Sequence, residues 1–397
     1  MQGVEGRGHM STIFDYIKRR GDFTFEQLPL NLIDSLAFTE LCYAPFDKVL
    51  NSEINCRGIT ISALYKKFIS DKTIPEKFGA FIPAHEIIEL LKLMASSERY
   101  QNIRVRGYIN DVSIDEEKQF CAMCFDLSEE TSYISFSGTD DTIIGWKENF
   151  NMALFTPIPS QKEAFYYLNK VANSCTSRLY IGGHSKGGNL AVYSAVKANK
   201  QIQNRIIQVH NFDGPGFERE FIQHIKNTSI LPKIINILPE NTAVGAIFED
   251  IGERVIVKSS AKGFLQHDAF TWKILDNDFV HARGVSKSSK EFHDLLNILV
   301  SQISEEEKKD LVEAIYKLFS VNNSTTLTDI TSNKLKFLLG ILKTDSKTRK
   351  IFFKAIKIII KEKYFKASVK KEAKRKCHKK SDLIEQNSEI NIKKALK

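Results

Sequence analysis

The sequence predicts an α/β fold in which a mostly parallel sheet is covered by helices on both faces, followed by an all-helical basic extension. Apolar strand patterns alternate with amphipathic helical patterns from residue 132 to residue 258, and this alternation is typical of parallel sheets. Residues 103–127 instead predict an antiparallel hairpin at one edge of the sheet. No strand pattern remains after about residue 285.

The individual helices and strands are expected from the spacing of apolar residues. Before the hairpin, helices are expected at residues 11–20, 31–45, 59–69 and 85–97. After it, strands are expected at 132–136, 178–183, 205–212, 233–238 and 254–258, with helices at 143–155, 160–174 and 216–227 and another directly after residue 185. The extension is expected to hold helices at residues 288–304, 305–321, 334–342 and 350–365.

These elements suggest how the chain is divided into domains. Met10 is an alternative start, so we treat residues 1–9 as a leader. We expect residues 10–285 to form the α/β domain and residues 286–365 to form the helical extension. Residues 366–397 are polar and rich in lysine, and this composition predicts disorder.

Positive charge is concentrated near the end of the chain. The net charge is +9, but residues 343–380 alone hold sixteen Lys and Arg against three Asp and Glu. This segment could bind an anionic membrane surface or nucleic acid, or form the solvated face of a packed helix. Its aromatic residues share an apolar stripe with isoleucines, which favours membrane binding or packing over base stacking. We therefore do not expect nucleic acid as a partner.

The cell compartment is predicted from missing signals. The N-terminus lacks the apolar core of an export signal, and no apolar run is long enough to span a bilayer. We therefore expect a cytoplasmic protein with reduced thiols, and the basic segment leaves peripheral membrane attachment open. Cys121 and Cys124 have metal-ligand spacing, but they lie in a strand pattern that points their side chains to opposite faces. We expect no metal site and no cofactor.

A glycine-flanked serine follows the strand expected at residues 178–183. The pattern Gly183-x-Ser185-x-Gly187 lies between this strand and an Ala/Val/Leu-rich helical segment. A nucleophile elbow needs this arrangement, because the serine adopts a strained conformation and its flanking residues must lack a Cβ. The helix that follows would place its N-terminal N–H groups beside developing negative charge. We interpret Ser185 as a nucleophile.

A serine nucleophile needs a base and an acid that orients the base. His267 lies on the loop after the last expected strand, where the base of such a fold belongs. Two carboxylates compete for the acid position, since Asp213 and Glu240 each follow a strand expected to end at the same edge of the sheet. We favour Asp213 and keep Glu240 as the alternative.

Two backbone segments are expected to stabilise the oxyanion. The N–H of Lys186 follows the nucleophile directly, and Gly138 and Thr139 lie on the turn after the strand at 132–136. We expect the Lys186 side chain to lie on the surface, either inert or available to an anionic substrate.

Five stretches of the chain resemble the lipase-like α/β hydrolases, and more closely a bacterial family of uncharacterised members with a GHSKGG nucleophile elbow. They are residues 13–46, 133–149, 180–193 (YIGGHSKGGNLAVY), 211–217 (NFDGPGF) and 266–272 (QHDAFTW). The resemblance implies an α/β-hydrolase fold, with Ser185 as nucleophile, His267 as base and Thr139 at the oxyanion position. Fungal-type lipases have an Asp before the Pro of the strand-end motif, whereas this chain reads INILPE at residues 235–240.

The residues and the resemblance together predict a serine hydrolase of small-molecule or lipid-derived carboxylic esters that acts through an acyl-enzyme. The alternative is a catalytically idle hydrolase fold that serves as a binding or membrane-associated module.

Overall fold

A computed structural model provides the structure of the 397-residue chain. It describes residues 11–71, 73–74, 76, 78, 83–139, 148–149, 151–152, 156–225, 228–321 and 344–362. The helix expected at 334–342 and the tail at 366–397 lie outside the described residues, as does most of the helix expected at 143–155.

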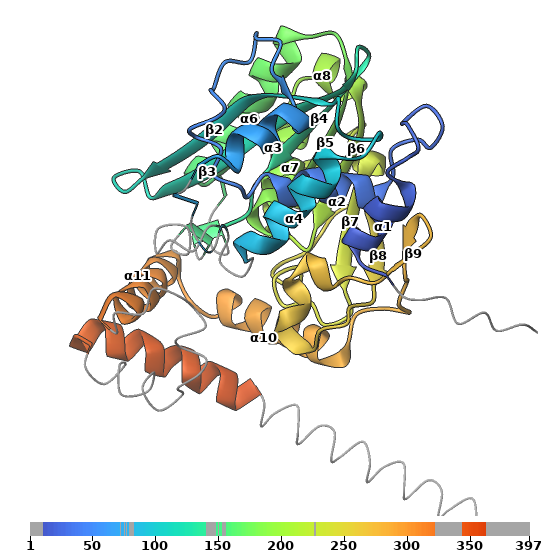
Figure 1. The fold of residues 1–397 in the computed structure, drawn as a ribbon. Coiled ribbons are helices and arrows are strands. Elements are labelled where there is room, and N and C mark those ends of the chain that lie inside the picture. Colours follow the sequence, from blue (N-terminus) through green and yellow to red (C-terminus); the bar gives the residue numbers. More distant parts are fainter. Residues whose placement is uncertain are drawn as a thin grey trace, which may run out of the picture.

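The centre of the fold is an eight-stranded sheet whose strands lie side by side in the order of the sequence (Figure 1). The strands are β1 (Ile59–Thr60), β2 (Arg104–Ser113), β3 (Lys118–Ser128), β4 (Thr131–Phe136), β5 (Arg178–His184), β6 (Ile206–Phe212), β7 (Ile234–Pro239) and β8 (Glu253–Val257). The pairs from β1 to β4 are antiparallel, and the pairs from β4 to β8 are parallel. The expected α/β class is therefore confirmed, with the hairpin β2–β3 near one edge.

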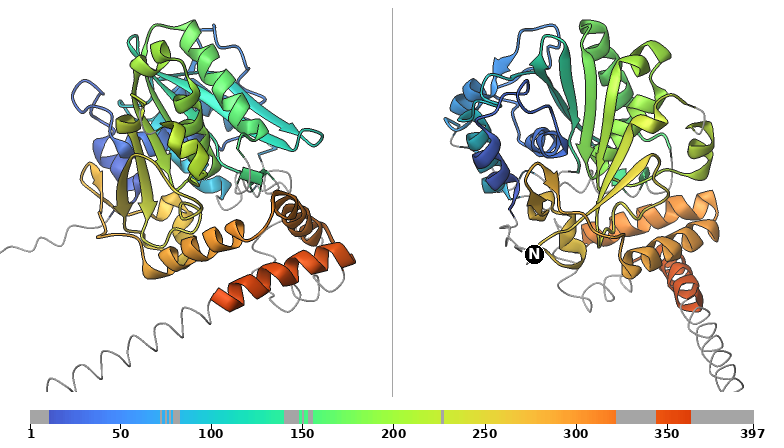
Figure 2. Two further views of the ribbon diagram at one scale, coloured as in Figure 1. Left: turned by 180° about the vertical axis from the view of Figure 1, so that it is seen from behind. Right: turned by 90° about the vertical axis from the view of Figure 1, so that its right-hand side faces the viewer.

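Helices cover both faces of this sheet (Figure 2). One face carries α1 (Ile13–Arg20), α2 (Leu32–Leu41), α3 (Ile61–Phe68) and α4 (Ala84–Ala95), and the other carries α6 (Pro159–Ser174), α7 (Lys186–Lys197), α8 (Lys200–Arg205) and α9 (Arg219–Ile225). Right-handed crossovers between strands that advance in one direction place the connecting helices on one side. The other side is left for α1–α4, which all precede β2 in the sequence.

The two faces bury separate hydrophobic clusters, and β3 contributes to both. Cys121 and Phe125 belong to the cluster beneath α1–α4, whereas Phe120 and Cys124 belong to the cluster beneath α6–α9. This alternation is the two-residue period of a strand. Cys121 and Cys124 are buried free thiols on opposite faces, as the sequence predicts.

A buried ion pair fixes the helices on the first face. Arg99 donates to both carboxylate oxygens of Asp34 at 2.8 and 2.5 Å, and neither side chain is exposed. The hydroxyls of Tyr16 and Tyr100 donate to the same carboxylate. Asp34 lies in the first turn of α2, so this cluster joins α2 to α1 and to the loop after α4.

The C-terminal extension is helical, as expected. It contains α10 (Lys287–Ser301), α11 (Glu305–Val321) and an unlabelled helix at residues 346–362, drawn in red in Figure 1. The capping box at the start of α11 is present, since Glu307 and Ser304 each accept the other's backbone N–H, at 2.9 and 3.2 Å. No helix in the described part of the chain has the length and apolar character needed to cross a bilayer.

A short hairpin of β9 (Ile274–Leu275) and β10 (Asp278–Phe279) follows the main sheet and was not expected from the sequence. Two residues per strand are too few to show an alternating pattern. In the sequence, the hairpin comes shortly after the 3₁₀ turn Gly263–His267, whose last residue is the candidate base.

Candidate active site

Ser185 occupies a strained turn at the carboxyl end of β5. It joins β5 to α7 with φ 56° and ψ −129°, a conformation that side-chain-bearing residues rarely adopt. A Cβ on Gly183 would collide with the backbone of Gly187, and a Cβ on Gly187 would collide with the backbone of Phe136. The glycines on either side of Ser185 are therefore required by close packing of strand against helix.

His267 and Asp213 come together beside this turn. The Nδ1–H of His267 donates to Oδ2 of Asp213 at 2.7 Å, and the carboxylate is fully buried. The other oxygen, Oδ1, accepts the backbone N–H of Gly245 at 3.2 Å and the hydroxyl of Thr242. With Nδ1 holding the hydrogen toward Asp213, Nε2 is the nitrogen of His267 that can accept a proton.

The competing carboxylate makes a different set of contacts. Glu240 follows β7, and its backbone N–H donates to the carbonyl of Val257 at 3.1 Å. Its own carbonyl accepts the N–H of Ser286 at 2.6 Å. The structure thus pairs His267 with Asp213, and it uses the backbone of Glu240 to anchor the start of α10.

His184, directly before Ser185, holds the loop that carries His267. Burial keeps its pKa well below the ordinary value, so the ring is neutral. Its Nε2 lies 2.9 Å from the carbonyl oxygen of His267 and must carry the hydrogen, because a carbonyl only accepts. Nδ1 is then an acceptor, and the hydroxyl of Tyr43 lies 3.0 Å from it. Tyr43 and the role of His184 were not predicted from the sequence.

The QHDAFTW stretch folds into a tightly held loop around the candidate base. The indole N–H of Trp272 donates to the carbonyl of Gln266 at 2.8 Å, and the Gln266 side chain accepts the N–H of Asn241 at 2.9 Å. Asp268 caps the following 3₁₀ turn by accepting the N–H of Phe270 at 3.0 Å. These contacts set the backbone position of His267.

The expected oxyanion segments border Ser185. A Cβ on Gly138 would lie 3.0 Å from the Cβ of Ser185 and would collide with the hydroxyl of Tyr43, so the loop after β4 packs against the nucleophile. Thr139 is buried and its hydroxyl donates to the amide oxygen of Asn149 at 2.7 Å. Lys186 is the first residue of α7, where backbone N–H groups have no acceptor within the helix.

The side chain of Lys186 is not on the surface, and the expectation that it lies there is wrong. Its ammonium is fully buried and lies 3.0 Å from Oε2 of Glu148. It also donates to the backbone and side-chain oxygens of Gln119. Because the charge is enclosed and paired, this ammonium cannot attract an anionic substrate.

Glu148 extends this buried pair to two further elements. Its Oε1 accepts the N–H and the hydroxyl of Ser160 at 3.0 and 2.6 Å, and its Oε2 accepts the N–H of Gln119 at 3.1 Å. The Gln119 side-chain amide donates to the carbonyl of Gly138 at 3.5 Å. Charged and amide groups therefore connect the elbow helix, β3, the start of α6 and the loop after β4.

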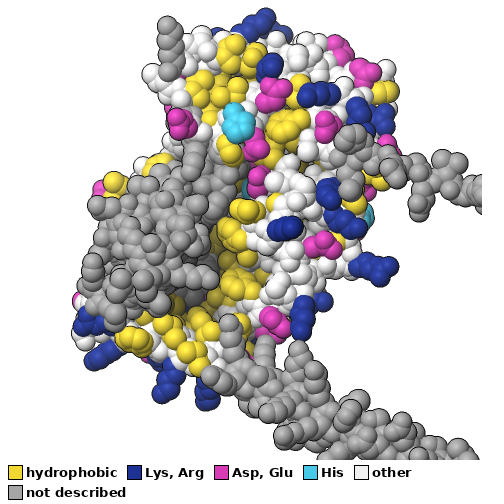
Figure 3. Space-filling model, turned by 60° about the horizontal axis from the view of Figure 1, so that its bottom comes forward, with side chains coloured by type: hydrophobic (Ala, Val, Ile, Leu, Met, Phe, Trp, Pro, Cys, Tyr) yellow, Lys and Arg dark blue, Asp and Glu magenta, His cyan; other side chains and the backbone are white. Residues whose placement is uncertain are grey.

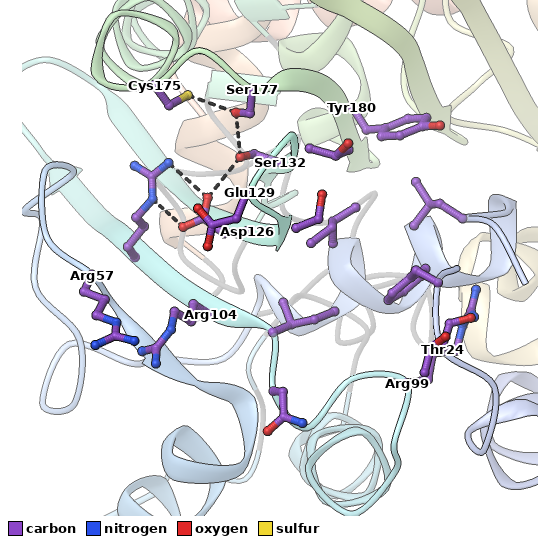
Figure 4. Close-up of a pocket in the computed structure, with 18 of the residues that line it drawn as sticks. Thr24, Arg57, Arg99, Arg104, Asp126, Glu129, Ser132, Cys175, Ser177 and Tyr180 are labelled. Atoms are coloured by element: carbon purple, nitrogen blue, oxygen red, sulfur yellow. Dashed lines mark hydrogen bonds and ion pairs between the residues drawn. The ribbon is translucent and has the colours of Figure 1, made fainter. Parts of the chain in front are cut away.

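A cavity of about 840 Å³ lies elsewhere, toward the amino ends of β4 and β5 (Figure 4). Within its lining, Arg106 pairs with Asp126, and Ser132 connects Asp126 to Ser177. Catalytic groups of parallel α/β folds collect at the opposite, carboxyl edge. We therefore assign no catalytic role to this cavity.

Among the residues that the structure describes, no group of three or more His, Cys, Asp and Glu side chains could hold a metal ion.

Residues 94–317, more than half of the chain, match the family described as Mbeg1-like. The chain belongs to the Mbeg1-like family. The matched part contains Ser185, Asp213 and His267 and continues through α10 into α11. In this family member the eight strands follow the sequence order across one α/β sheet, and the turn at Ser185 joins β5 to α7.

Among solved structures, the chain is similar to one titled "Crystal structure of M37 lipase", with 16% sequence identity and a TM-score of 0.32. The similarity covers 54% of this chain and 68% of that one. No curated protein matches the chain.

Proposed function

We propose that this Mbeg1-like protein is a serine hydrolase that cleaves carboxylic esters through an acyl-enzyme. The observation that carries the proposal is the 2.7 Å hydrogen bond from His267 Nδ1 to buried Asp213. This bond selects the tautomer in which Nε2 serves as general base, and it stabilises the imidazolium that forms when the base takes a proton. The strained elbow at Ser185 supplies the nucleophile.

The reaction then follows the chemistry of a triad. Ser185 Oγ attacks the ester carbonyl carbon while His267 Nε2 takes its proton. Collapse of the tetrahedral intermediate breaks the bond to the alcohol, which leaves with the proton from His267. Water attacks the acyl-Ser185 ester in the second half, again through His267, and releases the carboxylic acid.

The negative charge on the tetrahedral oxygen needs donors that are already in place. The backbone N–H of Lys186 and the segment Gly138–Thr139 border Ser185, and we assign them this role. One such donor contributes about 3 kcal/mol to transition-state stabilisation. The hydroxyl of Thr139 donates its hydrogen to the amide oxygen of Asn149, so it holds the segment in place before substrate binds, and the donor to the oxyanion is a backbone N–H.

The substrate class follows in part from Lys186. Because its ammonium is paired with Glu148 inside the protein, the residue next to the nucleophile offers no charge to an anionic acyl group. We therefore propose neutral carboxylic esters, including lipid-derived ones, as substrates.

A fluorophosphonate probe tests the proposal directly. We expect the wild-type protein to be labelled, and Ser185→Ala to remain folded and unlabelled. Hydrolysis of p-nitrophenyl butyrate should be lost in parallel. A folded wild-type protein that is neither labelled nor active would contradict the proposal and would favour the idle-fold alternative.

A further inference from the structure

The helix at residues 346–362 has two different faces. Its inner face packs against α10 and α11, where Ile351, Phe352 and Ala355 are buried in one cluster with Ile303 and Leu311. Its outer face carries lysines and two large apolar residues, all of them exposed: Lys347, Lys350, Phe353, Lys354, Lys357, Ile360 and Lys361.

Three lysines on the outer face have no counter-charge in the described part of the chain. Lys347 pairs with Asp310 at 2.7 Å, and Lys354 pairs with Glu307. For Lys350, Lys357 and Lys361 no ion pair is present among the residues that the structure describes. At 3.6 residues per turn these three side chains fall within a narrow arc of the helix surface. They form a cationic stripe that points away from the protein.

Two large apolar side chains border this stripe. Phe353 is 53% exposed and Ile360 is 48% exposed, and their spacing of seven residues places them two turns apart on one side of the helix. Single exposed apolar residues are common on soluble proteins. A line of aromatic and aliphatic side chains beside a row of lysines is instead typical of helices that lie in a membrane interface.

The helix lies on the side of the molecule that carries the candidate active site (Figure 2). The helix packs on α10, and α10 is anchored to the loops after β7, where His293 Nδ1 lies 2.7 Å from the carbonyl of Ala246. Leu265, two residues before His267, is 65% exposed. Figure 3 shows hydrophobic side chains gathered on this face, with Lys and Arg side chains near its edge.

We propose that the outer face of helix 346–362 binds the surface of an anionic phospholipid bilayer. Phe353 and Ile360 enter the boundary between head groups and acyl chains, and Lys350, Lys357 and Lys361 contact the anionic head groups. The apolar side chains favour a bilayer over nucleic acid, whose backbone would leave them exposed to water. The proposal does not require Ser185 to be catalytic.

Vesicle co-sedimentation of the full chain tests the proposal, with vesicles of phosphatidylcholine alone or mixed with phosphatidylglycerol. We expect binding only to the anionic vesicles, weakened by salt. Each lysine contributes about fivefold to partitioning, so K350Q/K357Q/K361Q should weaken binding about a hundredfold. F353S/I360S keeps the charge and should weaken binding on the order of tenfold.

Matched controls test whether vesicle binding depends on this face of the helix and not on the overall positive charge or on catalysis. K66Q/K67Q/K200Q removes three exposed lysines of the α/β domain and should bind as wild type does. All variants should keep wild-type hydrolysis of soluble p-nitrophenyl butyrate, and Ser185→Ala should bind vesicles normally. The proposal would be overturned if the wild-type protein did not bind anionic vesicles, or if the helix variants bound them as wild type does. Binding of a DNA duplex in place of vesicles would also overturn it.

Discussion

Lys186 and Glu148 form a fully buried ion pair, with Nζ 3.0 Å from Oε2, directly behind the turn that presents Ser185. Removing one partner of such a pair leaves an uncompensated charge inside the protein. The pair also connects the first turn of α7 to Gln119 and, through it, to the loop that holds Gly138. Stability and the geometry of the candidate oxyanion site therefore depend on the same contact.

Lys186→Met is expected to lower the free energy of unfolding by about 3–5 kcal/mol, because Glu148 would remain buried without its counter-charge. Urea unfolding followed by circular dichroism measures this change. K186M/E148L removes both charges and should be more stable than K186M alone. Lys200→Met, at an exposed position at the start of the next helix, is the control and should change stability by less than about 0.5 kcal/mol. If the loss of stability in K186M/E148L equalled the sum of the losses in the two single variants, Lys186 and Glu148 would not be coupled and the prediction would be wrong.

Asp213→Asn is expected to lower kcat for p-nitrophenyl butyrate about a thousandfold or more, because the amide no longer selects the His267 tautomer. Glu240→Gln is the matched control and should keep wild-type kcat, since the backbone of Glu240 makes the contacts seen there. Thermal unfolding of both variants separates loss of catalysis from loss of fold. Loss of activity in Glu240→Gln with retention in Asp213→Asn would reverse the assignment.

Much of the fold could be predicted because its determinants are local. The alternation of strands and helices and the Gly183-x-Ser185-x-Gly187 turn are each readable within a short window of sequence. The acid was harder, because Asp213 and Glu240 both follow neighbouring parallel strands. The two carboxylates are distinguished only by which of them His267 contacts, and His267 lies 54 residues along the chain from Asp213.

The side-chain partners of Lys186 and His184 could not be predicted from the sequence. Lys186 stands on the first turn of a helix, a position that suggests exposure, yet its partner Glu148 lies 38 residues away. Tyr43 and His184 are separated by 141 residues. No local pattern links such pairs, because their contact exists only once the helices have packed on the sheet.

Glu86 is expected to make stability fall as pH rises. Burial, followed by the nearby charge of Asp268, raises the pKa of Glu86 from 4.5 to about 7. The folded protein then holds this proton more tightly than the unfolded chain does, so the contribution is complete below about pH 4.5 and is lost as pH rises to about 7. Glu40, beside the same carboxyls, has a pKa raised by burial and acts in the same direction.

The measurement is urea unfolding of wild type and Glu86→Gln from about pH 4.5 to about pH 8. The stability difference between them should change across this window, because glutamine does not titrate. Glu89→Gln, on the same helix with a side chain 40% exposed, serves as control and should show no such change. If wild type became more stable relative to Glu86→Gln as the pH rises, the pKa of Glu86 would not be raised in the folded protein and the prediction would be wrong.

Tyr43→Phe is expected to lower kcat about tenfold with KM unchanged, since it removes the donor to Nδ1 of His184. His184 then loses one of the two hydrogen bonds that hold its ring, and its hold on the carbonyl of His267 weakens. Tyr167→Phe is the matched control, because it removes a buried hydroxyl that donates to Gly107 at 2.8 Å on the other face of the sheet. A purely structural effect would lower stability equally in both variants and leave kcat of the remaining folded enzyme unchanged. A positioning role predicts instead that only Tyr43→Phe changes kcat and the pH profile of kcat, which reports on His267.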